Sequence, residues 1–312
     1  ISEAIKTSEI EGEYMSREDV MSSIKNNLGV KPTVVVKDKR ASGIAKLMLE
    51  VNQNINQVLN LDKILGWHKV LMEYDPKLNA GQWRKGAEPM QVVSGAYGRE
   101  IVHYEAPPSE NVSTEMGNFI NWYMHSELPV NDHISKALLK SAIAHLYFES
   151  IHPFEDGNGR IGRTLAEFTL SQGLQSSALL SISKIIEQDK NKYYDQLKFA
   201  QRSLDITDWI NYFAQLILDA QKDAKELIHF TLKKAKFFDQ YGKQLNERQL
   251  KAIQRMLENG TAGFEGGMTA KKYIAITKTS KATATRDLQD LHEMGVFGLE
   301  GAGRSVRYEL VL

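Results

Sequence analysis

One run of twelve residues, 152–163, constrains this chain more than any other part of it. It combines a histidine, an aspartate, two arginines and a glycine-rich turn in the sequence HPFEDGNGRIGR. Before it, apolar residues recur at helical spacing, which predicts a buried helix over about residues 135–150. Pro153 ends that helix and biases His152 toward an extended conformation. The run is therefore expected to follow directly on a helix.

A second helix is predicted to start near Asn158 and to stop at Gly173, because apolar residues after the run again recur at helical spacing. Gly157 and Gly159 permit a tight turn in which main-chain N–H groups point at one place. A helix N-terminus also attracts anions. The junction of the two helices is therefore predicted to hold an anion.

The charged side chains of the run indicate which anion. Arg160 and Arg163 are predicted to lie in the first turn of the second helix, where a cation is disfavoured by roughly 0.3–1 kcal/mol. The planar fork of arginine suits phosphate, so two of them favour an anion of high charge. Asp156 supplies the hard oxygen that Mg²⁺ takes alongside phosphates. His152 is placed to accept a proton from an attacking hydroxyl. The run predicts a nucleotide-phosphate site with its own base.

Two simpler interpretations of the run are weaker. Residues 157–162 match the dinucleotide pattern G-x-G-x-x-G, but that pattern requires a preceding strand, and here a helix and His-Pro precede it. A solvated loop with an incidental histidine would explain the histidine alone. It does not explain a histidine, an aspartate, two glycines and two arginines together.

The run resembles the motif H-P-F-x-D/E-G-N-G-R-x-x-R of Fic-domain proteins at every defined position. The resemblance implies transfer of AMP from Mg-ATP to a Ser, Thr or Tyr hydroxyl of a target protein. It implies that His152 is the general base and that Asp156 binds Mg²⁺. The implied ATP contacts are Glu155, Asp156, the anion hole of Gly157, Asn158 and Gly159, Arg160 at the inner phosphates and Arg163 at the γ-phosphate. A relative that transfers phosphate has Ala and Lys in place of Gly157 and Gly159, which argues against kinase chemistry here.

Residues 1–30 are predicted to form two helices, the first ended by Gly12 and the second capped by Ser16. Glu11 lies in the last turn of the first helix, against the helix dipole. From the local sequence alone, a solvated glutamate is the simpler interpretation. Residues 7–12, however, resemble the inhibitory motif [S/T]-x-x-x-E-[G/N] of one class of Fic proteins. That resemblance implies that Glu11 pairs with Arg163 and blocks the γ-phosphate; in some relatives the same glutamate helps to remove AMP.

Residues 80–105 interrupt the helical pattern. Residues 90–93 and 101–104 are short β-prone runs around residues 94–98, which predicts a hairpin. Together with residues 81–84, this stretch resembles the β-hairpin flap of Fic proteins, which aligns a target segment. An exposed strand edge can hold a target peptide through main-chain hydrogen bonds.

Other positions have more ordinary interpretations. Tyr193 and Tyr194 lie on a predicted helix over 188–201, at a spacing that lines the adenine pocket in relatives; core packing is an equal alternative. His68 has no ligand-type neighbour at helical spacing and is taken as structural. Further helices are predicted over about 40–59, 61–74, 114–127 and 207–238.

Residues 245–312 are predicted to be a separate unit of three helices and a hairpin, which resembles a winged helix. Its third helix follows Ser280 and carries Lys281 and Arg286, as a helix that enters a major groove does. Arg304 and Arg307 lie where a wing would meet phosphates. The rival function is therefore a DNA-binding regulator whose Fic core senses nucleotide or also removes AMP. Winged helices also bind proteins and form dimers, so a homodimer is a further expectation.

Composition sets the remaining limits. The 312 residues are 42% hydrophobic, which allows a large core. Lys+Arg and Asp+Glu are both 39, so no net field favours nucleic acid or an acidic membrane. The absence of cysteine excludes disulfides and fits a reducing cytoplasm. No apolar run approaches membrane-spanning length. Because the chain begins at Ile1 and not at Met, we expect that preceding residues are missing.

We therefore predict a mainly α-helical protein with three parts. These are an inhibitory helical segment (1–30), a Fic-type catalytic core with a hairpin flap (31–240) and a small winged-helix domain (245–312). The expected partners are ATP and a target protein, with the chain itself as one candidate target, and no membrane.

Overall fold

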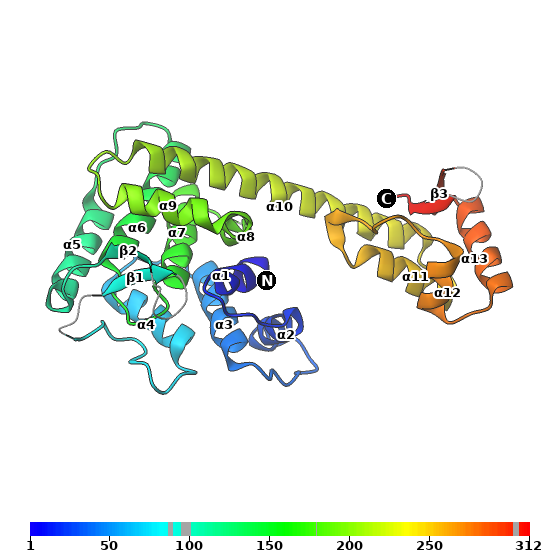
Figure 1. Ribbon diagram of the computed structural model, residues 1–312, viewed down its shortest axis with the longest axis horizontal. Helices are drawn as coiled ribbons and strands as arrows, with labels where there is room; N and C mark the ends of the chain where they lie inside the picture. The colour runs from blue at the N-terminus through cyan, green and yellow to red at the C-terminus, as the bar shows by residue number, and fades with distance from the viewer. Residues whose placement is uncertain (87–89, 95–100, 179, 302–305) are drawn as a thin grey trace. The chain divides into compact units, whose positions relative to one another are not determined.

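The computed structural model describes residues 1–86, 90–94, 101–178, 180–301 and 306–312. The chain is mainly α-helical, as predicted (Figure 1). It divides into two compact units, residues 1–221 and 222–312. The division falls within one long helix, α10 (Thr207–Tyr241).

The first unit is a helical body with one hairpin. Its helices before the motif are α1 (Ser2–Ile10), α2 (Arg17–Asn27), α3 (Lys39–Gln53), α4 (Leu61–Met72) and α5 (Val112–His125), with a 3₁₀ turn η1 (Ser109–Asn111) before α5. The remaining helices are α6 (His133–Ile151), α7 (Asn158–Leu174), α8 (Ile182–Gln188), α9 (Lys190–Ala200) and the start of α10. Helices α6 and α7 pack on each other and carry the motif at their junction.

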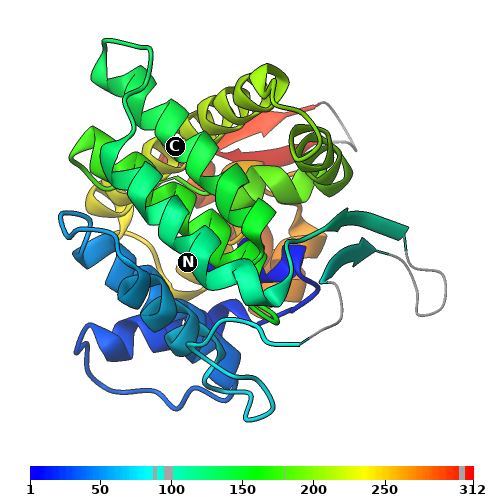
Figure 2. The same cartoon turned by 90° about the vertical axis from the view of Figure 1, so that its left-hand side faces the viewer.

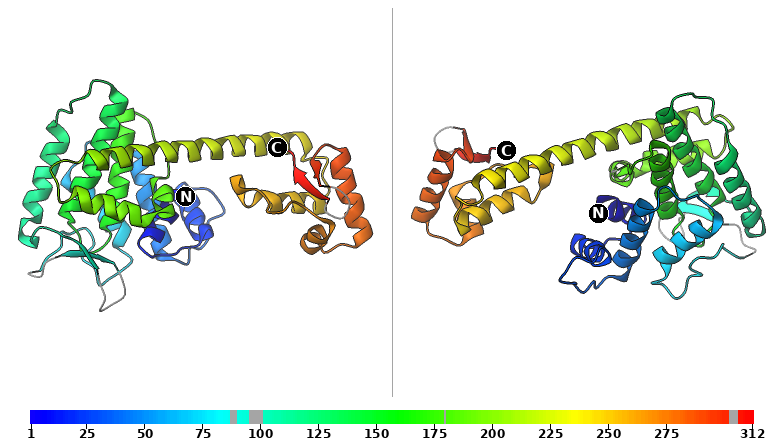
Figure 3. Two further views of the ribbon diagram at one scale, coloured as in Figure 1. Left: turned by 45° about the horizontal axis from the view of Figure 1, so that its top comes forward. Right: turned by 180° about the vertical axis from the view of Figure 1, so that it is seen from behind.

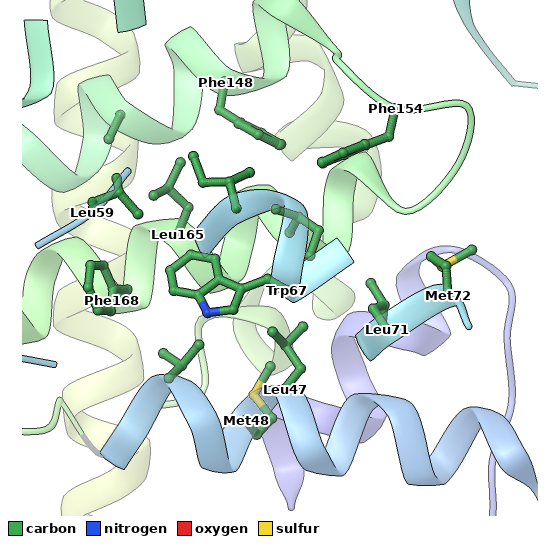
Figure 4. Close-up of a cluster of buried hydrophobic side chains, with 14 of the residues drawn as sticks. Leu47, Met48, Leu59, Trp67, Leu71, Met72, Phe148, Phe154, Leu165 and Phe168 are labelled. Carbon is green, nitrogen blue, oxygen red and sulfur yellow. The ribbon is translucent and has the colours of Figure 1, made fainter. Parts of the chain in front are cut away.

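A large apolar core fixes α7 against α3, α4 and α6. Trp67 of α4 is fully buried at its centre, with its ring 5.1 Å from that of Phe168 of α7 (Figure 4). Phe148 of α6 and Phe154 of the motif lie in the same cluster. Each large side chain of this kind contributes about 1.5–3 kcal/mol by leaving water. The core therefore holds the two ends of the motif rigidly.

The hairpin is formed by β1 (Gln91–Ser94) and β2 (Ile101–Glu105), which pair antiparallel with Gln91 opposite Glu105 and Ser94 opposite Ile101. The register shifts between Val92 and Val93. The two strands lie at the edge of the helical body (Figure 2). The hairpin predicted over 90–104 is present. Of its expected turn, residues 94–98, Ser94 belongs to β1 and residues 95–98 lie outside the described residues.

The N-terminal helices pack on the motif-bearing part of the unit. Helix α1 contacts α8, α7 and α3, and α2 contacts α3. Gly12 has φ +81° after α1, and the Ser16 side chain accepts from the main-chain N–H of Asp19 at the start of α2, as the sequence predicts.

Three features differ from the helical pattern predicted by periodicity. Helix α3 ends at Gln53 and not near 59, because Asn54 leaves the helical conformation and Asn60 caps the next helix. Gly173 lies inside α7 and is not its stop. A Cβ at Gly173 would overlap Ala137 of α6, so this glycine permits close helix packing. The short helix α8 was not predicted.

The second unit comprises the end of α10, three further helices and a two-stranded sheet (Figure 3). These elements are α11 (Glu247–Leu257), the 3₁₀ turn η2 (Gly260–Ala262), α12 (Ala270–Thr277), α13 (Lys281–Glu293), β3 (Phe297–Glu300) and β4 (Arg307–Leu310). The strands pair antiparallel, with Phe297 opposite Leu310. This element order is the one expected of a winged helix, and that assignment stays a prediction.

Asp287 of α13 is an internal anchor of the second unit. Its exposed fraction is 3%, and its carboxylate accepts from Arg248 Nε (2.8 Å) and from the Tyr273 hydroxyl (3.0 Å). Asp287 therefore does not lower the positive charge of the exposed face of α13, although a count of the charged residues in the helix would include it. Arg304 lies outside the described residues. Within the described ranges, no helix is both long enough and apolar enough to cross a membrane.

Candidate active site

His152 ends α6 in a left-handed conformation, with φ 50° and ψ 60°. The extended conformation predicted from the following proline is wrong. The His152 N–H instead donates to Phe148 O (2.9 Å), so the residue closes the last turn of the helix before Pro153 forces the chain away. This places the imidazole on the pocket side of the α6–α7 junction.

Arg84 clamps the motif from the segment before the hairpin. Its exposed fraction is 4%, and its Nε donates to His152 O at 2.8 Å. Its other nitrogens donate to Ser109 Oγ (2.8 Å) and to Pro107 O. From the sequence, Arg84 was expected only to belong to the flap region, within residues 81–84. Nothing in the local pattern indicates that a buried arginine ties the hairpin base to the motif.

The motif loop, residues 152–157, is held by its own side chains and by α4. Asn158 is buried and forms two hydrogen bonds with the main chain of Phe154, each 2.8 Å. His68 stacks on Phe154 with ring centroids 3.7 Å apart. Its Nδ1 accepts from Gly81 N (2.9 Å), which leaves Nε2–H to donate to Asp156 O (3.1 Å). Burial lowers the pKa of His68 to about 4, so the ring is neutral and structural.

Because the Asn158 side chain is engaged with Phe154, only its main-chain N–H remains for an anion. Gly157 is the N-cap of α7 with φ +83°, a conformation that favours glycine. Asp156 Oδ1 accepts from Gly157 N at 2.5 Å. The first N–H groups of a helix have no partner within the helix. Gly157, Asn158 and Gly159 at the start of α7 line a pocket of about 460 Å³, which we call the motif pocket.

The motif pocket brings together most of the predicted site residues. Its described lining is Ile10, Glu11, Gln91, Tyr104, Glu149, His152, Glu155, Asp156, Gly157, Asn158, Gly159, Arg163, Tyr193, Tyr194, Leu197, Lys198 and Gln201. Arg160 is not among these residues. Glu149, Lys198 and Gln201 were not predicted, since they lie on helices whose periodicity indicates only packing.

Arg163 lies in the second turn of α7 and not in the first, because the helix starts at Asn158. It is buried, and its Nη2 donates to Glu11 Oε1 at 2.6 Å. Thr7 of α1 accepts from Arg163 Nε with its hydroxyl (2.8 Å) and from Nη2 with its carbonyl (2.9 Å). One end of α1 thus satisfies the guanidinium of the last motif residue.

Arg160 is held by a second carboxylate of the N-terminal segment. Its Nη1 lies 2.6 Å from Glu13 Oε2, and its Nη2 lies 3.3 Å from Asp156 Oδ1. Glu13 also accepts from the Tyr74 hydroxyl at 2.9 Å. The exposed fraction of the Arg160 side chain is 1%. Glu13 lies only two positions after Glu11, but no local pattern predicted its contact with Arg160.

The tyrosines of α9 line the motif pocket together with the motif loop. Tyr193 is fully buried, and its hydroxyl lies 2.8 Å from His145 Nε2. Tyr194 is half-buried beside it, with ring centroids 5.2 Å apart. Both line the pocket, so packing and lining the site are compatible roles for these residues.

The His152 imidazole is neutral in this environment. Burial lowers its pKa to about 4, although the negative charge of Glu11 acts in the opposite direction. A neutral imidazole has one nitrogen lone pair that can accept a proton. The ring therefore has the protonation state of a general base at neutral pH.

The described residues contain no group of three His, Cys, Asp or Glu side chains that could enclose a metal ion. Asp156 offers a single carboxylate at the pocket, with half of its side chain exposed. Mg²⁺ commonly uses one or two carboxylates together with waters and substrate phosphates. The donor set therefore fits a cation that arrives with phosphates and does not fit a protein-enclosed metal.

Comparison with known proteins agrees with this geometry. A family model described as the Fic/DOC family matches residues 58–170, which include the motif, α4, α5, α6 and most of α7. These residues form a Fic domain. A second model, described as a domain of unknown function (DUF4172), matches residues 1–30, which form α1 and α2.

The Fic domain is shared with proteins of several animals. The protein adenylyltransferase Fic of Aedes aegypti is 26% identical over 209 residues, covering 66% of this chain and 38% of that protein. That of Nematostella vectensis is 23% identical over 209 residues, covering 66% of this chain and 44% of that protein. The chain thus spans less than half the length of these two curated relatives.

Solved structures show the same fold. A Fic family protein from Desulfovibrio desulfuricans is 20% identical with a TM-score of 0.57, over 99% of this chain and 85% of that chain. A Fic domain containing signaling protein from Bacteroides thetaiotaomicron is 17% identical with a TM-score of 0.52, over 70% of this chain and 83% of that chain. The fold class predicted for the core is confirmed.

Proposed function

We propose that this chain is a protein adenylyltransferase that moves AMP from ATP to a hydroxyl of a target protein and is held inactive by Glu11. The observation that carries the proposal is the motif pocket, which is lined both by a neutral imidazole and by the N-terminus of α7. The names of the curated relatives support this reaction class.

The pocket suits a nucleotide in two ways. At the start of α7, main-chain N–H groups and the positive end of the helix dipole attract a phosphate chain. Tyr193 and Tyr194 also line the pocket, and the partly exposed ring of Tyr194 is the candidate to stack on an adenine. A pocket of about 460 Å³ lies within the range of nucleotide and cofactor sites.

The reaction is a displacement at the α-phosphorus. The target hydroxyl gives its proton to the free nitrogen of His152, and its oxygen forms a new bond to the α-phosphorus. The bond from that phosphorus to the oxygen of pyrophosphate breaks, and pyrophosphate carries away the electron pair. Most of the rate enhancement comes from positioning and from donors aimed at the developing charge. The main-chain N–H groups of Asn158 and Gly159, which line the pocket, are the proposed donors to this charge.

Asp156 is the residue that would hold Mg²⁺, with Glu155 beside it. One carboxylate fits a cation that takes its other ligands from phosphates and water. The bound ion would supply charge neutralisation for the polyphosphate. In the present arrangement Asp156 Oδ1 is also bonded to Gly157 N and close to Arg160, which fixes its orientation.

Glu11 is proposed to inhibit by occupying the guanidinium that the γ-phosphate needs. The Glu11–Arg163 ion pair is short and one partner is fully buried. A triphosphate that binds productively must displace this carboxylate or place its γ-phosphate elsewhere. Displacement leaves Arg163 paired with phosphate, so the buried charge remains compensated.

The hairpin β1–β2 is proposed to align the target. Gln91 at the start of β1 and Tyr104 in β2 both line the motif pocket, so a peptide added at this sheet edge would lie near His152. Binding of this kind depends on the main chain of the target. It therefore does not name the target, and the chain itself is one candidate.

The proposal is tested by mass spectrometry of a protein extract incubated with ATP and the Glu11→Ala variant. We expect hydroxyl side chains that gain the mass of one AMP, and no such gain with His152→Ala added. Products that carry phosphate in place of AMP would contradict the proposed reaction. It would also be contradicted if no protein were modified and the purified variant did not bind ATP.

A further inference from the structure

Glu149 is a buried carboxyl group that the proposed mechanism does not use. It lies on α6, one helical turn before His152, and its exposed fraction is 6%. It nevertheless lines the motif pocket. Within the described part of the chain, its Oε1 has no hydrogen-bond partner, and neither has His152 Nδ1. Its Oε2 lies 3.7 Å from that same Nδ1.

A carboxyl group in this position is costly to the folded state. Burial without a full set of partners destabilises a polar group, and more so a charged one. Each such group in a native structure calls for an explanation, and proximity to a catalytic group is one. Glu149 Oε1 and His152 Nδ1 are the unpartnered atoms, and the other oxygen of the same carboxyl group, Oε2, lies 3.7 Å from Nδ1. An interaction between the carboxyl group and the imidazole would therefore explain why both groups are buried without partners.

We propose that Glu149 is the positioning residue of His152. Its carboxylate accepts the proton on Nδ1 and thereby leaves the Nε2 lone pair free for the target hydroxyl. This inference rests on the proposed function, because it gives His152 the role of base. The distance of 3.7 Å is slightly longer than a hydrogen bond, as catalytic contacts often are before the substrate is bound.

The packing of α6 on α7 leaves space for this carboxylate. A Cβ at Gly162 of α7 would overlap Glu149 Oε1 and would also press on the His145 ring. Glycine at this helical position therefore creates the room that Glu149 occupies. Gly117, in α5, offers a contrast, since a Cβ there meets nothing within 4 Å.

Several charged and titratable groups surround Glu149. Arg163 of α7 and Glu11 of the N-terminal segment act on its charge, and His145 and Tyr193 lie around it. Burial raises the pKa of Glu149 to about 8, Arg163 opposes this rise and Glu11 adds to it. Removal of Glu11 therefore favours the ionised carboxylate. Displacement of Glu11 would free the Arg163 guanidinium for phosphate and would also favour the ionised form of Glu149, which accepts a hydrogen bond.

This role of Glu149 adds no proton transfer to the proposed reaction. The target proton moves to Nε2, and His152 becomes a cation. Its Nε2–H then faces the target oxygen, and its Nδ1–H faces Glu149. The carboxylate stabilises this cation without taking the proton, as the carboxylate of a serine-protease triad does. The proton then leaves from Nε2 to the product phosphates or to water.

A competing acceptor is the main-chain carbonyl of Glu149, which also faces the His152 ring. If that carbonyl alone fixed the tautomer, the side chain would be dispensable. The two possibilities are separated by Glu149→Met, which keeps the length and apolar volume of the side chain but removes its oxygens. Glu149→Gln keeps an acceptor and removes only the charge.

The kinetic test uses Glu11→Ala as the parent, so that inhibition does not mask the effect. We expect Glu149→Met to lower kcat on the order of 10²-fold with KM for ATP little changed. Glu149→Gln should lower kcat less than Glu149→Met does. The parent rate should rise with pH through the pKa of Glu149, and this rise should be absent in Glu149→Gln. Gly162→Ala, which displaces the carboxylate, should resemble Glu149→Met, whereas Gly117→Ala should match the parent.

Thermal unfolding separates positioning from a structural role. A structural carboxyl group, once removed, lowers the melting temperature together with activity. A positioning residue kept at a cost to stability leaves the melting temperature of Glu149→Met equal to that of the parent or higher. Unchanged kcat in Glu149→Met would overturn the inference, and so would parallel losses of activity and melting temperature.

A readout without turnover keeps the inference testable if the proposed reaction is wrong. Nitrogen NMR of labelled His152 in the Glu11→Ala protein distinguishes its two neutral tautomers. We expect the Nδ1–H form in the parent and a shift toward the Nε2–H form in Glu149→Met. Failure of the parent to transfer AMP would refute the proposed function alone, whereas an identical tautomer in both proteins would refute the role of Glu149.

Discussion

Glu13 and Arg160 form an ion pair of 2.6 Å that ties the N-terminal segment to the first arginine of the motif. Glu11 forms a second one of the same length with the last arginine, Arg163. The segment between α1 and α2 therefore neutralises both motif cations. The two arginines differ in one respect, because Arg163 lines the motif pocket and Arg160 does not.

A double-mutant cycle on Glu13 and Arg160 should give a coupling free energy of about 1–3 kcal/mol, because Arg160 is almost fully buried. Lys46 and Glu73 form an exposed pair at 3.4 Å and serve as the control, with an expected coupling of about 0.5 kcal/mol or less. The measurement is urea unfolding followed by tryptophan fluorescence. All four tryptophans lie in residues 1–221, so the signal reports that unit alone. Equal coupling in both pairs would contradict the account.

His152→Ala in the Glu11→Ala background should abolish AMP transfer, a loss of at least 10²–10⁴-fold for a general base. Nucleotide affinity should stay within a few-fold, because the main-chain N–H groups of α7 remain. Calorimetry with ATP and magnesium measures the affinity. His125→Ala is the control, since His125 is exposed on α5 and bonded only to Asn121 O in the described structure. Transfer at the parent rate by the His152 variant would refute the assignment of the base.

His145 should make the first unit less stable in acid. Its buried pKa is about 3, lowered chiefly by burial, so the unfolded chain binds a proton that the folded state excludes. Its contribution to stability is present above the unfolded value near 6.5 and is lost as the pH falls below it. The slope is roughly 1.4 kcal/mol per pH unit.

The check compares wild type with His145→Gln between pH 7 and pH 5 by tryptophan-detected urea unfolding. The midpoint should fall further in wild type than in the variant over this interval. Other buried groups, such as Glu149 with its raised pKa, act with the opposite sign on the total but cancel in the difference. If the urea midpoints of the two proteins changed equally with pH, the buried His145 would not have the lowered pKa that this prediction requires.

The second unit provides a test of the rival function. On α13, Lys281, Thr285 and Arg286 are exposed, whereas Asp287 is turned inward. If this face contacts several phosphates, retention of the full chain on duplex DNA should fall steeply as salt rises. Lys281→Glu with Arg286→Glu should remove the retention, and Lys222→Glu outside α13 is the control. Negligible retention at low salt would exclude DNA as the partner of this unit.

The sequence predicted the helices on either side of the motif and the two strands of the hairpin, because these features are properties of short stretches of chain. Helical periodicity locates α6 and α7. The pairing of Glu11 with Arg163 was expected only from the resemblance of residues 7–12 to an inhibitory motif, since the local sequence favoured a solvated glutamate.

The remaining features depend on contacts between distant residues. Arg84 holds His152 O across 68 positions, and Glu13 reaches Arg160 across 147. His152 adopts a left-handed conformation because it closes a helix, which outweighs the usual bias before proline. Gly173 is required by close packing on Ala137 and not by a helix end. Periodicity reports none of these tertiary constraints.

The most direct measurement of the central claim compares ATP labelled at the α-phosphate with ATP labelled at the γ-phosphate. Both are given to the wild type, to Glu11→Ala and to Glu9→Ala. Glu9 is the matched control, because it lies on α1 but pairs with Lys6 and not with the motif. The account predicts that Glu11→Ala strongly raises protein labelling from the α-position alone, while Glu9→Ala matches wild type. Labelling from the γ-position, or equal α-labelling in all three proteins, would contradict it.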